Sequence, residues 1–542
     1  MSSQWSKPDT SGGNPVSLSR RAFLTASVAT VTLAATGCSD PGPATTSADR
    51  PTSPGAGQRT TTSHSAKLAS DPFTLGVASG DPLADRVILW TRLAPDALAG
   101  DGSGGMFSDP VDVAWEVAID ARFTKIATKG TFTARYDHGH SVHVDADGLD
   151  PATDHFYRFR VGEWTSPIGR TRTLPVGTPD RFTLAVANCQ MMETGAWAAY
   201  RHLAARDVDL VLHLGDYIYE YPGVPGARMS QPAHAVVTLE DYRMRYASYR
   251  LDPDLQAAHA SVPFVVTWDD HEVANNYMGD VVPNTEAGGD LDRKAAAYQA
   301  WWENLPVRLD PPEGSVLDVH RRFEVGNLAR LHVLDERQHS DLPPCRPDPR
   351  DTTDFGDCDA RTDEDRSRLG VEQEKWLADG LARGGVTWNL LGNPVVLAGV
   401  DSGAPDGDPA YYLDVWDGFP QARARLIDQL AGSTNPVVLT GDYHQGMVLD
   451  VHAVPFDVDS PVVAPEFMAV PVSSVLFSQD VSARTPHLRE QLDHHGYLEV
   501  ELTPDRLTAQ FQVVADVADP ASAVSVASRW VVDAGDPVTR PA

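Results

Sequence analysis

The segment Val208-Asp209-Leu210-Val211-Leu212-His213-Leu214 leads directly into Gly215-Asp216-Tyr217-Ile218-Tyr219-Glu220-Tyr221. Its first half is an apolar run, which is typical of a β-strand buried on both faces. Gly215 permits the sharp turn by which a chain leaves such a strand. The segment therefore predicts a buried strand that ends in a turn rich in carboxylate and phenol groups.

Five other apolar runs have the same character, and helical patterns separate them. Buried strands that alternate with helices predict an α/β layered domain, which we place at residues 178–515. The expected strands are residues 182–187, 208–214, 262–268, 328–334, 386–391 and 436–440. The expected helices are residues 196–204, 239–251, 294–304 and 372–381.

The regions on either side of this domain show another pattern. Residues 73–173 contain short runs of alternating apolar and polar residues between Gly, Pro and Asp turns. This pattern predicts an all-β sandwich, which we place at residues 67–177. Alternation returns in residues 497–502 and 507–514. We expect residues 516–542 to form a short helical or loose C-terminal tail.

The N-terminus resembles a twin-arginine export signal, because Arg20 and Arg21 stand at the head of the first apolar run. That run is too short and too weakly apolar for a stable membrane anchor, so we interpret residues 1–38 as a signal peptide for export. Cys38 is either a lipidated first residue or lies near a cleavage site without lipid. Residues 39–66 are rich in Ser, Thr, Pro and Gly and predict a flexible linker. We expect a protein that is exported by the twin-arginine machinery and then secreted or attached to the outer face of the membrane, without a transmembrane span.

The charge balance excludes one class of partner. The chain has 44 Lys and Arg against 75 Asp and Glu, a formal net charge of −31. Affinity for nucleic acid depends on basic residues that neutralise phosphates, so we expect no nucleic-acid binding. The four cysteines are too few for a disulfide scaffold in 542 residues.

Four apolar runs end in residues that can bind metal ions, and strand ends of α/β folds converge on one crevice. Thiolate and phenolate ligands favour ferric iron, whereas carboxylates and Asn favour Ca²⁺ or Mg²⁺. A bridging Asp between two ions suits phosphate-ester hydrolysis, so the set predicts a mixed cluster. The four ends are Asn188-Cys189-Gln190, Gly215 to Tyr221, Asp269-Asp270-His271-Glu272 with Asn275-Asn276, and Gly441-Asp442-Tyr443-His444.

Each motif alone also has a structural interpretation. Cys189 could be a buried core thiol, and the Asp-Asp-His-Glu sequence could be a helix N-cap. Tyr217 and Tyr221 are better explained as packing residues. The recurrence of such residues at four strand ends favours a shared site over these separate explanations.

Taken in order, these motifs resemble the PhoD-type alkaline phosphatase family, from residue 73 to the mid-510s. The motifs flanking Asp216 and Asp270 are the most specific. The matching stretches are Gly76 to Pro82, Ile88 to Leu93, Asn188 to Gln190, His213 to Tyr221, Trp268 to Glu272, Asn275 to Tyr277, Leu334 to Gln338, Trp416 to Gly418 and Gly441 to His444.

The resemblance implies an αββα metallophosphatase-like sandwich preceded by a small fibronectin-like β-sandwich. It also implies a phosphomonoesterase, often with phosphodiesterase activity, that uses Fe³⁺ and two Ca²⁺ ions. Cys189, Asp216 and Tyr219 would hold the iron, and Asp216 would bridge to calcium. The remaining metal ligands would be Asp270, Asn276, Asp442 and His444.

Two further residues have expected roles in catalysis. His271 is either a metal ligand or a general acid at the leaving group. Arg337 is either a phosphate clamp, since a guanidinium matches phosphate in geometry, or part of a salt bridge. The resulting hypothesis is attack by a metal-bound hydroxide, with the ions and Arg337 stabilising the equatorial oxygens.

The chain departs from the family pattern at two places. Glu336 stands where a small polar residue is more usual, so the geometry near Arg337 is open. The segment between Cys345 and Cys358 looks like an insertion. In an oxidising compartment these cysteines are expected to form a disulfide. A second metal site is the alternative, but it lacks neighbouring ligands.

Two alternative functions remain from the sequence. One is a phosphodiesterase or phospholipase D of the same family, since the same metal site can serve esters with one or two substituents. The other is a non-catalytic lipoprotein that binds phosphate or cations at the cell surface. A binder would not need thiolate and phenolate ligands beside a bridging carboxylate, and metal content would separate the two.

Overall fold

A computed structural model describes residues 68–223, 228–285, 288–345, 348, 355–401, 403, 411–477 and 479–542. The expected signal, the linker and Cys38 lie outside these residues. Within the described residues, no helix is long and apolar enough to cross a membrane.

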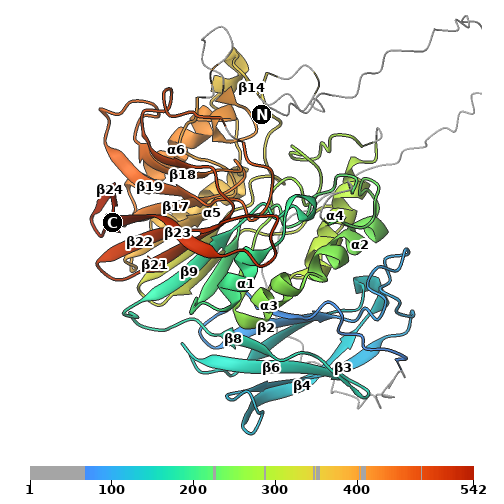
Figure 1. The fold of residues 1–542 in the computed structure, drawn as a ribbon. Coiled ribbons are helices and arrows are strands. Elements are labelled where there is room, and N and C mark those ends of the chain that lie inside the picture. Colours follow the sequence, from blue (N-terminus) through green and yellow to red (C-terminus); the bar gives the residue numbers. More distant parts are fainter. Residues whose placement is uncertain are drawn as a thin grey trace, which may run out of the picture. The chain divides into compact units, whose positions relative to one another are not determined.

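A ten-stranded sheet forms one half of the central structure (Figure 1), with the order β24-β23-β22-β21-β9-β10-β11-β1-β2-β5. Strands β9, β10 and β11 run parallel, and β21 pairs antiparallel with β9. The strands are β1 (Val77–Gly80), β2 (Arg86–Arg92), β5 (Ser141–Asp147), β9 (Phe182–Ala187), β10 (Leu210–His213), β11 (Phe264–Val266), β21 (Gly496–Leu502), β22 (Arg506–Val514), β23 (Val524–Asp533) and β24 (Asp536–Pro541).

A seven-stranded sheet forms the other half, with the order β12-β13-β15-β17-β19-β18-β20. Strands β13, β15, β17 and β19 run parallel. The strands are β12 (Arg321–Val325), β13 (Ala329–Val333), β15 (Trp388–Gly392), β17 (Pro436–Thr440), β18 (Gly446–His452), β19 (Val462–Met468) and β20 (Leu488–Leu492).

The two sheets pack face to face, as the alternation of side chains along the strands demonstrates. In β9, Leu184 and Val186 belong to a core shared with Val437 and Leu439 of β17. Ala185 of β9, on the opposite face, belongs to a different core that contains helical residues. Each central strand is therefore buried on both faces, which explains why these runs are almost wholly apolar.

In the part of the chain that the structure describes, six α-helices cover the outer faces, which gives the expected αββα architecture. Helices α1 to α4 pack on the ten-stranded sheet, and α5 and α6 pack on the seven-stranded sheet. Figure 1 shows α1 and α3 near β9, α2 and α4 farther to the right, and α6 beside β18 and β19. Two of these helices were not predicted from the sequence, and one of them starts with Asp252 as N-cap and Pro253 at the first turn. The helices are α1 (Ala198–Ala204), α2 (Leu239–Arg250), α3 (Pro253–Ser261), α4 (Asp290–Asn304), α5 (Val371–Leu381) and α6 (Pro420–Ala431).

The N-terminal β-sandwich shares one layer with the rest of the protein. Its outer sheet packs over β1, β2 and β5, with Val77, Leu89 and Phe159 in the core between the layers. Those three inner strands extend the ten-stranded sheet, because Gly80 of β1 pairs with Phe264 of β11. The sandwich is thus continuous with the α/β part. The outer sheet contains β3 (Val111–Ala118), β4 (Ile126–Ala134), β6 (Asp154–Val161), β7 (Trp164–Thr165) and β8 (Gly169–Arg172).

The expectation of a loose tail at residues 516–542 is wrong. Strands β23 and β24 occupy this region, and β23 pairs with β22 along its length. Trp530 and Val532 point into the core between the sheets and are 8% and 1% exposed. Burial of these two side chains stabilises a strand whose first half, rich in Ser and Ala, carries a weak sequence signal.

The segment after β13 contains the expected disulfide. Cys345 and Cys358 are bonded, with their Cα atoms 5.7 Å apart. Near it, the short strands β14 (Phe355–Gly356) and β16 (Tyr411–Tyr412) form a two-stranded sheet.

Candidate metal centre

The four strand ends singled out in the sequence meet at one place. Cys189, Asp216 and Asp270 follow the parallel strands β9, β10 and β11, and Asp442 follows β17 of the facing sheet. Their carboxylates and the thiol lie in a chain of close contacts. The convergence follows from topology, since parallel strands deliver their carboxyl ends to the same edge.

Two glycines allow these turns to approach so closely. A Cβ atom on Gly215, whose φ is +106°, would lie 2.4 Å from the backbone nitrogen of Asp269. A Cβ on Gly441 would lie 2.9 Å from the side chain of Asn188. A residue larger than glycine would therefore push the turn after β10 away from the turn after β11, and β17 away from β9.

Five of the candidate ligands have a left-handed backbone, which is uncommon for residues other than glycine. Such conformations persist when the surroundings impose them, and they cluster at functional sites. These turns thus place the side chains at the shared metal centre. The residues and φ values are Cys189 (53°), Asp216 (55°), Asn276 (56°), Asp442 (63°) and His444 (52°).

The buried carboxylate of Glu272 joins two of the turns. It accepts hydrogen bonds from the backbone nitrogens of Asp216 (3.1 Å) and Tyr217 (2.6 Å) after β10. It also accepts one from the backbone nitrogen of Asp269 (2.9 Å) after β11. Glu272 therefore fixes the position of one strand end relative to the next.

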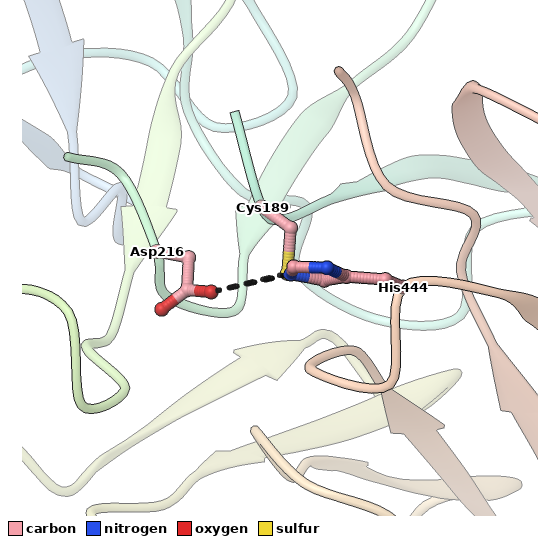
Figure 2. Close-up of side chains that lie close together, drawn as sticks. All are labelled: Cys189, Asp216 and His444. Carbon is pink, nitrogen blue, oxygen red and sulfur yellow. Dashed lines mark hydrogen bonds and ion pairs between the residues drawn. The ribbon is translucent and has the colours of Figure 1, made fainter. Parts of the chain in front are cut away.

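Cys189, Asp216 and His444 form the first group of possible metal ligands (Figure 2). The Cys189 Sγ lies 3.4 Å from Asp216 Oδ2, and His444 Nε2 lies 3.8 Å from the same oxygen. The hydroxyl of Tyr219 is 2.7 Å from Asp216 Oδ2 and 3.1 Å from His444 Nε2. Ser474 donates to the Tyr219 oxygen at 2.7 Å. Four different donor types thus face one small volume.

Two further groups continue from the first one. Asp216 and Asp270 lie together with His271, and Asp270 also lies with Asp269 and Asp442. Within each group the ligand atoms are all within 4.8 Å of one another. Asp216 and Asp270 each belong to two of the three groups, so the groups share ligands.

Several buried oxygens of this centre have no hydrogen-bond partner in the described part of the chain. Buried polar atoms are almost always satisfied, so a cluster of exceptions indicates a missing ligand. All of them are acceptors on acidic or amide side chains, which fits bound cations. They are Asn188 Oδ1, Asp216 Oδ1, Asp269 Oδ2, Asp414 Oδ1 and Asp442 Oδ2.

The electrostatics of the centre also fit a cation. Burial raises the pKa of the Cys189 thiol well above its usual value, and the nearby carboxylates of Asp216 and Asp442 raise it further. Burial raises the pKa of the Tyr219 hydroxyl well above its usual value, and Asp216 and Cys189 raise it further. Burial and Asp269 raise the pKa of Asp442 well above its usual value. A bound metal ion would reverse this effect and favour the deprotonated donors.

His271 is held between the centre and a second carboxylate. Its Nδ1 is 2.8 Å from Glu220 Oε2, and its Nε2 is 4.0 Å from Asp270 Oδ2. Burial opposes a charge on the ring, but Asp270, Tyr221 and Asp216 raise the pKa of His271 well above its usual value. Both interpretations from the sequence, ligand and proton donor, are compatible with this position.

Arg337 lies in a core salt bridge, the alternative to a phosphate clamp. Its side chain is fully buried, with Nε 2.5 Å from Asp269 and Nη1 2.6 Å from Asp414. Its Nη2 lies 3.6 Å from Asp270. A guanidinium enclosed by three carboxylates orients those carboxylates, and its Nη2 has no hydrogen-bond partner among the described residues.

The structure brings together most of the residues that the sequence analysis expected at the site. Asn276 contacts the centre through its backbone nitrogen, which donates to Asp270 Oδ2 at 2.6 Å. Tyr217 is buried, as a packing residue should be, but Tyr221 is 38% exposed. Asp269 was not predicted as a site residue, although it stands within one of the four motifs. Ser474 was not predicted either, because no local motif contains it.

Comparison with known proteins agrees with this geometry. A sequence model described as PhoD-like phosphatase matches residues 184–511, and one for the N-terminal domain of these phosphatases matches residues 58–175. The chain is 40% identical to alkaline phosphatase D of Bacillus subtilis (strain 168) over 487 residues, which cover 86% of this chain and 81% of that protein. A solved structure of PhoD is 39% identical, with a TM-score of 0.83 over 88% of this chain and 93% of that chain.

These similarities extend through both the sheet sandwich and the N-terminal strands, and they do not favour a non-catalytic binding protein. The chain belongs to the PhoD-like phosphatase family and is a phosphatase.

Proposed function

We propose that the enzyme hydrolyses phosphate monoesters at a mixed centre of iron and calcium. The observation that carries this proposal is the unsatisfied acceptor atoms that face one another where four strands end. Asp216 Oδ1, Asp269 Oδ2 and Asp442 Oδ2 are buried carboxylate oxygens without a partner among the described residues. Ionised carboxylates in such proximity repel one another, and bound cations would relieve this repulsion without protonation of the carboxylates.

The donor types suggest how the ions are distributed. Cys189, Tyr219 and His444 surround Asp216 with sulfur, phenol and imidazole donors, which suit ferric iron. Asp270 and Asp442 offer oxygen donors, which suit calcium. We assign Asn276 to the calcium side because its backbone contacts Asp270. Asp216, shared by two groups, would bridge the ions.

The bound cations would supply positive charge that stabilises the phosphoryl oxygens and makes water more acidic. The residues of the chain would orient the reactants around that charge. Glu220 holds the His271 ring through its Nδ1 at 2.8 Å. His271 would then give a proton to the leaving alkoxide. Arg337 fixes the orientation of Asp269 and thus acts as a positioning residue.

A pair of tyrosine variants tests the iron assignment. Tyr219→Phe removes a hydroxyl that lies 2.7 Å from Asp216, whereas Tyr217→Phe removes a buried hydroxyl that bonds His259 instead. We expect Tyr219→Phe to lose most activity on a chromogenic phosphate monoester and to lose the purple phenolate–iron absorption. The Tyr217→Phe control should keep both. Full activity and unchanged colour in folded Tyr219→Phe would refute the assignment.

Metal analysis of the purified enzyme tests the composition of the centre directly. We expect iron and calcium in the wild-type protein, and less of both in an Asp216→Asn variant, because Asp216 is the shared ligand. Rates on a phosphomonoester, a phosphodiester and a phospholipid would show which ester class the enzyme prefers. A colourless wild-type protein without iron that still turns over the monoester would contradict the mixed centre.

We also propose that the chain is exported by the twin-arginine route. The support is the pair Arg20 and Arg21 before an apolar run, followed by a linker rich in Ser, Thr, Pro and Gly. A reporter fused to residues 1–66 should be exported from the cytoplasm, and the same reporter with Arg20→Lys and Arg21→Lys should remain in the cytoplasm. If the wild-type protein carries covalently bound lipid and the Cys38→Ala variant does not, Cys38 is the site of a lipid anchor. Export of the double variant at the normal rate would refute the route.

A further inference from the structure

The two histidines of the centre are partly exposed to solvent. The side chain of His444 is 12% exposed and that of His271 is 9% exposed. Two of the carboxylates are more deeply enclosed, with Asp216 at 2% and Asp270 at 4%, whereas Asp442 is half-buried. The two rings and Asp442 are therefore the parts of the centre nearest to solvent.

An exposed aromatic side chain contacts each of the two histidines. Phe477 stacks on His444, with ring centres 4.7 Å apart and planes inclined by 26°. Tyr221 meets His271 edge to face at 5.1 Å. Phe477 is 48% exposed and Tyr221 is 38% exposed. The two rings come from separate loops, one after β19 and one after β10, and each lies beside a partly exposed histidine of the centre.

Further contacts hold these rings in place. The Tyr221 hydroxyl donates to Asn275 Oδ1 at 2.7 Å, and its ring stacks with Tyr219 at 6.3 Å. Phe477 also packs edge to face on Tyr443 at 6.3 Å. The apolar surface of both rings thus lies at a defined position beside the centre, with part of each ring left to solvent.

Exposed aromatic surface beside a polar, multiply acidic centre suits a ligand with two parts. The phosphoryl group would lie among the carboxylates and their cations, and the group esterified to it would extend outward past the histidines. Aromatic rings attract other rings by stacking and edge-to-face contacts. The excess of acidic residues in the chain does not favour an alcohol that carries additional negative charge.

We propose that Tyr221 and Phe477 form an aromatic rim that binds the alcohol part of the substrate and selects esters whose alcohol carries an uncharged aromatic ring. This inference rests on the proposed function, because it assumes that phosphate binds at the metal centre. It extends that function by naming a substrate class and two specificity-determining residues.

Binding of phosphonates, which cannot be hydrolysed as esters, tests the rim independently of turnover. The metal-loaded enzyme is titrated with benzylphosphonate and with propylphosphonate, and the ratio of the two Kd values is measured. We expect benzylphosphonate to bind on the order of 5-fold more tightly, as one aromatic contact would provide. Phe477→Ala and Tyr221→Ala should each bring the ratio closer to one.

Matched variants separate the ring from other effects of substitution. Tyr221→Phe and Phe477→Tyr keep an aromatic ring and should keep the ratio. Tyr136→Ala is the remote control, because Tyr136 is 44% exposed and also packs on a histidine, His140, in the N-terminal sandwich. It should leave the ratio unchanged.

The outcomes distinguish the rim from the proposed function. Equal Kd values in the wild-type enzyme, or a ratio that neither alanine variant changes, overturn the rim even if the enzyme hydrolyses esters. If the Kd ratio depends on both rings, the rim is supported. If, in the same enzyme, benzyl phosphate and propyl phosphate are bound but not hydrolysed, the proposed function is refuted and the rim is not. Failure of both phosphonates to bind overturns both.

Discussion

Buried charges occur in two contrasting settings in this protein. In one, Arg92, Arg243 and Glu303 lie where β2, α2 and α4 meet, and each charge is satisfied by its neighbours. Arg243 donates to both oxygens of Glu303, at 2.7 and 2.5 Å. Arg92 donates to the backbone oxygen of Gly139 at 2.9 Å and to the side chain of Asn304 at 3.2 Å. None of the buried nitrogen and oxygen atoms of these three side chains lacks a hydrogen-bond partner in the described part of the chain.

The metal centre is the opposite case. Asp216, Asp269, Asp270 and Asp442 gather within a few ångströms, and the fully buried cation Arg337 and the buried ring of His271 lie beside them. Three of these carboxylates keep an oxygen without a hydrogen bond in the described chain. Burial, together with the neighbouring charges, raises the pKa of Asp269 to about 8, despite Arg337.

The difference separates charges that stabilise the fold from charges that serve a ligand. A paired and fully hydrogen-bonded cluster loses much stability when one partner is removed. A cluster of like charges costs stability until a ligand neutralises it. We therefore expect substitutions in the two places to have opposite consequences for stability and for activity.

The largest expected effect is on activity and comes from Asp442→Asn. This change removes one charge from the acidic centre, and we expect kcat/KM on a phosphomonoester to fall about 10³-fold, since metal ions contribute several kcal/mol to such reactions. In the presence of a chelator, the free energy of unfolding should stay the same or rise, because repulsion within the centre decreases. Assays of activity and metal content check the first expectation, and denaturant unfolding checks the second. A chelated variant several kcal/mol less stable than the chelated wild type would contradict the contrast.

Glu303→Gln should have the converse effect. It leaves Arg243 without its buried partner, and we expect the free energy of unfolding to fall by about 3–5 kcal/mol. Specific activity of the remaining folded enzyme should not change, because Glu303 lies outside the metal centre. Glu240→Gln, an exposed residue on α2, is the control and should alter stability little. Loss of activity in folded Glu303→Gln would show that the two clusters are coupled.

Glu466 offers an intermediate case, a buried carboxylate with hydrogen bonds but no ion pair. It accepts from the backbone nitrogens of Leu397 (2.9 Å) and Ala398 (2.7 Å), and burial raises its pKa to about 7 from 4.5. The folded state therefore holds this proton more tightly than the unfolded state does. The stability that Glu466 contributes is complete below pH 4.5 and is lost as the pH rises through 7.

A comparison at two pH values measures this contribution. From the interval between the two pKa values, we expect Glu466→Gln to gain roughly 3 kcal/mol relative to wild type between pH 4.5 and pH 8. Because the variant and the wild type are compared at each pH, contributions from other groups cancel. If the free energies of unfolding of Glu466→Gln and the wild type differ by the same amount at both pH values, Glu466 does not have a raised pKa in the folded protein.

The sequence predicted the central strands because their burial on two faces leaves an uninterrupted apolar run. The predicted strand at residues 182–187 coincides with β9, and that at 436–440 coincides with β17. The strands near the edges are less regular in pattern, and β23 was missed for this reason. Its burial depends on pairing with β22, which no local pattern in β23 reveals.

The residues at the strand ends were predictable because topology alone places them together. Residues that support them were not, since their role depends on contacts distant in sequence. Arg337 bonds Asp414, 77 positions away, and Ser474 bonds Tyr219, 255 positions away. The exposure of Tyr221 likewise depends on the surrounding loops and not on its motif.

The smallest expected effect concerns Glu272. This buried carboxylate lies at the metal centre, but its role is to stabilise the turns that carry the ligands, as Glu303 stabilises the packing of α2 and α4. Its two oxygens accept three backbone N–H groups, from Asp216, Tyr217 and Asp269. An amide has one acceptor oxygen, so Glu272→Gln must leave at least one of these N–H groups without its partner. Because supporting residues of metal sites typically contribute 10- to 100-fold, we expect a loss of about that size in metal affinity or kcat/KM. Titration of metal into the chelated variant, with Glu240→Gln as control, would measure it. If Glu272→Gln lost stability but bound metal as tightly as wild type, Glu272 would belong with the charges that stabilise the fold.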